Sequence, residues 1–156
     1  MAYPTVEAPY GLVPINLIGG QPYAGSTRQM KIASGYATDI FNGDVVKRAA
    51  DGTIQKETGT TTVTATGVIG VFVGVTYTDP STSQKTFKQY YPASTAASDI
   101  QAYVVDDPDA LFKVAVVSGT TVIAGTGYTS IGSNAALVQN AGSTTTGNSK
   151  VAINAI

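Results

Sequence analysis

Two turn-forming dipeptides, Asn42-Gly43 and Asp51-Gly52, constrain the fold of this chain more than any other feature. Asparagine, aspartate and glycine tolerate the positive φ angles that tight hairpin turns require. Between the two turns, Asp44–Ala49 has the composition of a strand, and Thr53–Lys56 follows as its return partner. The stretch Ile32–Ile54 therefore predicts an antiparallel strand pair bounded by turns.

Short strand signals recur along the rest of the chain. The apolar segment Val68–Thr76 (VIGVFVGVT) has the length of a strand and predicts the most buried one, in which Gly70 and Gly74 indicate a close backbone approach or a bulge. Phe87–Tyr91 alternates, which places Phe87 and Tyr91 on one face. Leu111–Val117 with Thr121–Ala124 indicates a further hairpin. The 156 residues suit one domain, and we expect a mainly β fold, a single antiparallel β-sandwich or barrel.

The N-terminal segment has a different character. Pro4, Pro9, Pro14 and Pro22 exclude a helix there, so residues 1–27 are expected to form an extended arm ahead of a β domain at 28–156. Its apolar side chains need cover, either from the domain's own core or from a neighbouring subunit, and we favour a partner. Tyrosine is enriched at protein interfaces. The candidate partner contacts are Tyr3, Tyr10, Leu12, Val13, Ile15, Leu17, Ile18 and Tyr23.

The composition argues against most kinds of chemistry. The chain has no histidine and no cysteine, so it lacks the commonest general base and the usual zinc ligands. We therefore predict no catalytic residue, no metal, no cofactor and no enzyme activity. Only 12% of residues are charged, the net charge is −1 and the basic residues are scattered, which predicts no nucleic-acid partner. No apolar run reaches the roughly 20 residues of a membrane span.

Three local patterns leave expectations for the structure. Asp106, Asp107 and Asp109 form the one acidic cluster, which could supply calcium ligands but which we interpret as a turn. Asn140–Ser149 is polar and of low complexity, which indicates a flexible loop. Val151–Ile156 alternates like a strand and has no polar tail after it, as a fragment truncated at its C-terminus would.

Three segments resemble a known family. They are ASGYATDIFNGDVVK at Ala33–Lys47, GVFVGVTYTDP at Gly70–Pro80 and VVDDPDALFKV at Val104–Val114. Together they resemble tailed-phage virion structural proteins of the capsid decoration, or cement, type, over roughly Pro9–Val138.

The resemblance implies a function without an active site. A protein of this type binds the outer surface of an assembled phage head and bridges major capsid subunits, so the implied location is the virion surface. The implied partners are the major capsid protein and further copies of the chain itself, as a dimer or a trimer. Two alternatives stay open: another virion component, such as a head fibre base, minor capsid or tail subunit, and a carbohydrate-binding β module that stacks tyrosines on sugars.

Overall fold

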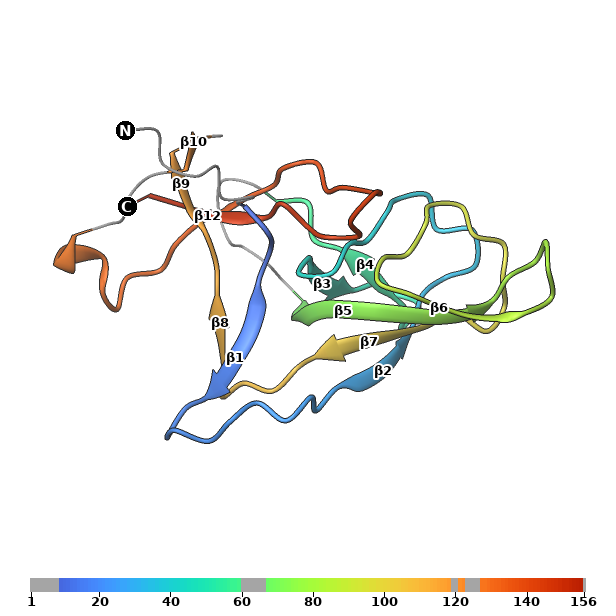
Figure 1. Cartoon of the computed structure of the whole chain (residues 1–156), viewed down its shortest axis with the longest axis horizontal. Coiled ribbons are helices and arrows are strands. Elements are labelled where there is room, and N and C mark those ends of the chain that lie inside the picture. The colour runs from blue at the N-terminus through green and yellow to red at the C-terminus, as the bar shows by residue number, and fades with distance from the viewer. Residues whose placement is uncertain (1–8, 60–66, 119–120, 123–126, 156) are drawn as a thin grey trace.

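The computed structural model describes residues 9–59, 67–118, 121–122 and 127–155, and it is built of β-strands and loops (Figure 1). Among these residues the one helical element is a 3₁₀ turn, η1 (Tyr128–Ser130), and no helix there is long and apolar enough to cross a membrane. The predicted mainly β fold is confirmed. The strands are β1 (Val13–Leu17), β2 (Arg28–Lys31), β3 (Val45–Arg48), β4 (Ile54–Lys56), β5 (Val68–Thr78), β6 (Lys85–Lys88), β7 (Gln101–Val105), β8 (Ala110–Lys113), β9 (Val116–Ser118), β10 (Thr121–Val122), β11 (Leu137–Val138) and β12 (Ala152–Asn154).

The largest sheet has six strands, in the order β2-β7-β5-β3-β4, with β6 also paired to β5. All of these pairs are antiparallel, and β3 and β6 occupy the two halves of one edge of β5. Strand β5 is consequently paired along both edges, and Phe72, Val75 and Tyr77 in it are buried. The predicted segment is central in the sheet, but it is not the most buried strand, because Val68 at its start is 41% exposed whereas no residue of β7 is exposed.

The two glycines of β5 have the roles that the sequence indicated. A methyl group on Gly70 would overlap the carbonyl oxygen of Val105, so the backbones of β5 and β7 can approach only because residue 70 has no side chain. The register between the same two strands shifts between Phe72 and Gly74, which is a bulge.

Both predicted turns are present. Strands β3 and β4 pair across the turn at Asp51-Gly52, where Gly52 has a φ of 85°. The Asp51 carboxylate accepts hydrogen bonds from the backbone N–H of Thr53 at 3.0 Å and from its hydroxyl at 2.7 Å. At the other turn Gly43 has a φ of 96°.

One face of the six-stranded sheet carries the main core. Loops around residues 32–41 and 90–100, which lie together beside β5 and β6 in Figure 1, cover this face. The fully buried Tyr91 belongs to this core and pairs with Ile40. Phe87 instead points outward, so the predicted shared face for these two aromatic residues is wrong. Strand β6 ends at Lys88, and the alternation of faces ends with it.

The opposite face is buried over only part of its area. Val45, Val71 and Val105 form one row across β3, β5 and β7, and all three are buried. The next rows of the same face, toward β6, contain Tyr103 and Phe87 and are not buried in this way.

The segment Leu111–Val117, predicted as one strand, forms two strands in different sheets. Strand β8 pairs with β1 in a two-stranded ribbon, whereas β9 belongs to a four-stranded sheet in the order β10-β9-β12-β11. The predicted hairpin is present as the pair of β9 with β10, in which Ser118 lies opposite Thr121, while residues 123–124 are outside the described part. The sheets described here do not close into a barrel, and the domain is sandwich-like.

The segment Asn140–Ser149 is a loop, as predicted, and its last residues are packed against the body of the protein. The backbone N–H of Asn42 donates to the carbonyl of Gly147 at 3.0 Å, and the N–H of Ser149 donates back to Asn42 at 2.9 Å. Ser149 is fully buried. The small residues of the segment allow the backbone to approach closely. After them β12 forms, as predicted for Val151–Ile156, and pairs in parallel with β9.

Candidate interaction surface

The β1–β8 ribbon exposes large apolar side chains. Strand β1 pairs with β8 in antiparallel register, with a bulge between Pro14 and Asn16. The exposed fractions are 40% for Val13, 54% for Ile15, 62% for Ile18 and 42% for Leu111. Several such residues together on one ribbon are typical of an interaction surface rather than of ordinary scattered exposure. We call these four residues the ribbon patch.

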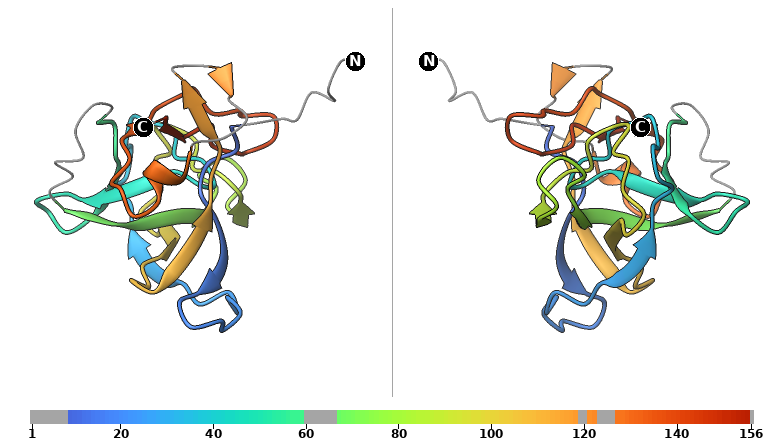
Figure 2. Two further views of the ribbon diagram at one scale, coloured as in Figure 1. Left: turned by 90° about the vertical axis from the view of Figure 1, so that its left-hand side faces the viewer. Right: turned by 90° about the vertical axis from the view of Figure 1, so that its right-hand side faces the viewer.

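The ribbon lies across one end of the six-stranded sheet (Figure 1). The segment after β1, residues 18–27, projects from the body of the molecule, as Figure 2 shows from two opposite sides. At its base, the backbone N–H of Leu17 donates to Gln21 and that of Ile18 donates to Asp109, both at 2.8 Å. The patch is therefore held in place by backbone hydrogen bonds.

The structure brings together only part of the predicted contact set. Tyr10, Leu12, Leu17 and Tyr23 are half-buried, and Tyr3 lies outside the described residues. The Lys113 ammonium lies 5.7 Å from the centre of the Tyr10 ring. The Tyr23 hydroxyl donates to the carbonyl of Ser26 at 3.2 Å, and burial raises the pKa of Tyr23.

Leu111 is the ribbon-patch residue that the sequence did not single out. Its segment reads as a strand, but nothing local indicates that this strand pairs with one that lies about a hundred residues earlier. The pairing of β1 with β8 also shows in part how the N-terminal segment is covered. Strand β8 of the same chain satisfies the backbone of β1, while the outward side chains stay exposed. The prediction of a separate arm at 1–27 remains a prediction, although β1 is hydrogen-bonded to the remainder.

A close crossing of three backbone segments fixes the start of β1. The N–H of Leu12 donates to the carbonyl of Gly43 at 3.0 Å. A methyl group on Gly11 would lie 2.7 Å from the Cβ of Ser149 and 2.9 Å from the Cα of Gly43, and Gly11 has a φ of 79°. Neither glycine can therefore carry a side chain without displacing its neighbours.

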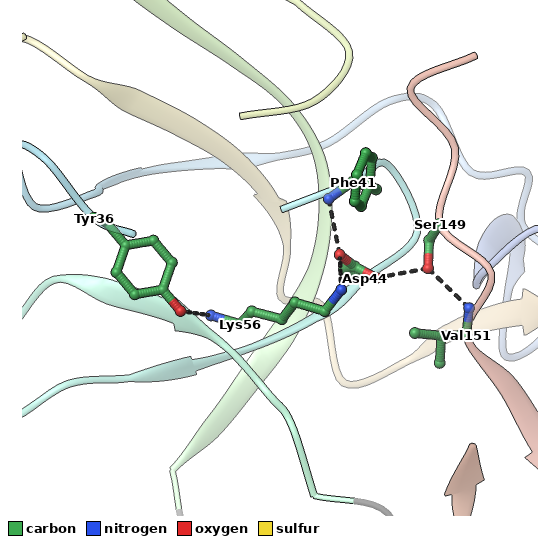
Figure 3. Close-up of polar contacts among 6 residues, drawn as sticks. All are labelled: Tyr36, Phe41, Asp44, Lys56, Ser149 and Val151. Atoms are coloured by element: carbon green, nitrogen blue, oxygen red, sulfur yellow. Dashed lines mark hydrogen bonds and ion pairs between the residues drawn. The ribbon is translucent and has the colours of Figure 1, made fainter. Parts of the chain in front are cut away.

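A buried carboxylate lies beside this crossing (Figure 3). Asp44 accepts hydrogen bonds from the Phe41 backbone N–H at 2.8 Å and from the Ser149 hydroxyl at 2.6 Å, and it lies 2.9 Å from the Lys56 ammonium. The Ser149 hydroxyl in turn accepts from the N–H of Val151 at 3.0 Å.

The carboxylate at the centre of this network is inaccessible. The side chains of Asp44 and Lys56 are only 1% and 12% exposed. Each carboxylate oxygen has a partner, so the charge is compensated where it is buried. The network joins the β3–β4 hairpin to the segment leading into β12. Its role is therefore to hold elements together, because a substrate has no access to the carboxylate.

The acidic cluster forms a turn, as we interpreted it. The Asp107 carboxylate accepts from the N–H of Asp109 at 2.9 Å, and Asp106 is paired with the Arg28 guanidinium at 2.7 Å. Across the residues that the structure describes, no group of three or more acidic, histidine or cysteine side chains is arranged to hold a metal ion.

One exposed carboxylate has a strongly altered acidity. Asp99 accepts hydrogen bonds from the Thr78 backbone N–H at 2.9 Å and from its hydroxyl at 2.7 Å, and the Lys85 ammonium lies 3.2 Å away. These interactions lower the pKa of Asp99 to about 2, the bonds from Thr78 contributing most. They tie the loop before β7 to β5 and β6.

Comparison of this chain with protein-family models, curated proteins and solved structures finds no match. The resemblance to capsid decoration proteins is therefore an expectation from the three segments quoted from the sequence, which these comparisons do not test.

Proposed function

We propose that this protein is a capsid decoration protein. It binds the outer surface of an assembled tailed-phage head through the ribbon patch and bridges major capsid subunits. The observation that carries the proposal furthest is the exposure of Val13, Ile15, Ile18 and Leu111 on one ribbon. When a partner covers apolar side chains placed together in this way, the burial of their surface stabilises the complex.

The local structure of the patch supports a binding role. The ribbon is held by β1–β8 pairing and by the crossing at Gly11 and Gly43. The backbone of the ribbon therefore loses little conformational entropy when a partner binds. The similarity of Ala33–Lys47, Gly70–Pro80 and Val104–Val114 to decoration proteins supplies the class of partner.

The mechanism is linkage. A ligand that binds the assembled shell and not free subunits stabilises the shell by mass action, by about 2.7 kcal/mol per site when its free concentration is a hundred times Kd. Bridging neighbouring subunits adds an effective-concentration advantage. The shell then resists heating and internal pressure better than the undecorated one.

Binding to expanded, empty heads of the phage that carries the gene tests the proposal. We expect the purified chain to cosediment with heads at a saturating, subunit-like ratio and to raise their melting temperature. A double variant, Ile15→Asp with Ile18→Asp, should bind at least about tenfold more weakly. Removing one hot-spot side chain costs about 2 kcal/mol of binding free energy, and about 1.4 kcal/mol is already a factor of ten in Kd. It should fold normally, since both side chains are exposed.

The matched control is Ile131→Asp, which changes an isoleucine that is 75% exposed and outside the ribbon. If the control loses binding and the ribbon variant does not, the ribbon is not the contact. If the unaltered chain binds no form of the capsid, the decoration function itself is wrong. A copy number far below that of the major capsid protein would instead indicate another virion component.

A further inference from the structure

The uncovered part of the six-stranded sheet has the composition of a sugar-binding surface. Two rows of outward-facing residues are defined by the strand register. Gln29 of β2, Tyr103 of β7 and Gly74 of β5 form one row. The next row contains Lys31, Gln101, Thr76 and Phe87. We call these seven residues the open face.

Two aromatic rings form its centre. The rings of Phe87 and Tyr103 are stacked, with centroids 5.8 Å apart and planes inclined by 17°. Phe87 is 72% exposed. Beside the rings, where Gly74 has no side chain, lies a shallow depression of about 440 Å³. Its volume falls in the range of small-ligand sites.

Polar groups surround the rings. Gln29 lies beside Tyr103 in the first row, and Gln101 lies in the second row. Each side-chain amide offers both donors and an acceptor, as adjacent sugar hydroxyls require. Thr76 is only 5% exposed, and its hydroxyl has no hydrogen-bond partner among the described residues.

The charge of the open face selects among partners. Lys31 is exposed, whereas Asp99, the acidic residue at the edge of the face, is already paired with Lys85. A symmetric contact with a second copy would bring two Lys31 ammonium groups into one interface without a free carboxylate to match them. A ligand with its own carboxylate complements the charge.

We propose that the open face binds an acidic glycan. A pyranose ring stacks its C–H face on Phe87, the two glutamine amides, which lie two and three strands away, hydrogen-bond to hydroxyls of the neighbouring sugar residues, and Lys31 pairs with the carboxylate of a uronic or sialic acid residue. This site is separate from the ribbon patch, and it does not depend on the capsid function proposed above.

Calorimetric titration of the full chain with hyaluronan octasaccharide tests the proposal, with a neutral N-acetylglucosamine oligomer as the uncharged comparison. We expect saturable binding of the acidic oligosaccharide, about threefold tighter than that of the neutral one, as for a solvent-exposed ion pair. Phe87→Ala should weaken binding by about tenfold through loss of the stacked ring. Lys31→Gln should remove the preference for the acidic oligosaccharide.

The matched control is Tyr128→Ala, which removes an aromatic ring that is 92% exposed but lies on η1. It should bind as the unaltered chain does. Thermal unfolding of each variant verifies its fold. The proposal is overturned if hyaluronan does not bind at millimolar concentration, if Phe87→Ala binds unchanged, or if Tyr128→Ala weakens binding equally. Binding without preference for the acidic oligosaccharide would overturn the role of Lys31 and the choice of ligand.

Discussion

At the scale of single residues, Gly70 is constrained by the backbone of the neighbouring strand. Replacing it with alanine would place a methyl group on the carbonyl oxygen of Val105, and a backbone atom in a sheet cannot move aside cheaply. We expect Gly70→Ala to lower the free energy of unfolding by about 1–3 kcal/mol, as overpacking does. Urea denaturation measures the change.

Gly74→Ala is the natural control in the same strand. Its added methyl group would meet the Lys88 carbonyl at 3.5 Å, an ordinary contact. Neither position requires a positive φ, so the two variants differ in steric overlap rather than in backbone conformation. Equal destabilisation by both would contradict the close approach of β5 and β7.

The buried network at Asp44 should behave as one unit. Asp44→Asn leaves the Lys56 ammonium without its carboxylate and should cost about 3–5 kcal/mol of unfolding free energy. Ser149→Ala removes the hydroxyl that bonds both Asp44 and Val151 and should cost about 1–3 kcal/mol. Because the two residues are in contact, the double variant should lose less than the sum. Strict additivity in a denaturation cycle would show that they are not coupled.

Asp99 gives the stability of the protein a dependence on acid pH. Its pKa of about 2 in the folded protein is below the ordinary 3.8, so the ionised carboxylate favours folding above pH 3.8. That contribution is lost as the pH falls from 3.8 toward 2. Asp99→Asn should therefore lower the melting temperature at neutral pH, and the difference from the unaltered chain should shrink through this range. A difference that is constant with pH would contradict the assignment.

At the scale of elements, the β1–β8 ribbon is expected to open more readily than the centre of the six-stranded sheet. An isolated two-stranded ribbon is marginally stable, whereas β5 and β7 are paired on both edges within the largest sheet. Amide hydrogens of β1 and β8 should therefore exchange with solvent faster than those of β5 and β7, as measured by NMR or mass spectrometry. Capsid binding should slow the exchange in the ribbon. Equal protection of all four strands in the free protein would contradict this view.

The sequence predicted the elements whose causes are local. The dipeptides Asn42-Gly43 and Asp51-Gly52 set their own backbone conformation, and the glycines of β5 signalled a close approach and a bulge. Pairing between residues far apart in the chain could not be predicted from local sequence patterns. The Ser149–Asp44 hydrogen bond joins residues 105 positions apart, so no local pattern in Asn140–Ser149 distinguished a packed segment from a flexible one.

The same distinction applies to the candidate surface. Val13, Ile15 and Ile18 were found because apolar residues among prolines need cover. Leu111 and Phe87 were not singled out, since their exposure depends on which strand lies beside them and where β6 ends.

At the scale of the whole molecule, the C-terminal segment connects the two larger sheets. Strand β12 lies between β9 and β11, while Ser149 just before it is bonded to Asp44 at the start of β3. We therefore expect the sheets to unfold together. NMR signals from β5 and β12 should disappear with the same urea midpoint. Separate midpoints would show that the four-stranded sheet unfolds independently.

The crossing of Gly11, Gly43 and Ser149 also has an evolutionary consequence. These positions come from the beginning, the first third and the end of the chain, yet a larger side chain at one of the glycines would overlap the other positions. We therefore expect substitutions at the three positions to be coupled, because a side chain added at one would overlap the others. In an alignment of relatives that share this fold, the three positions should remain small or vary jointly, even where the ribbon patch diversifies with its partner.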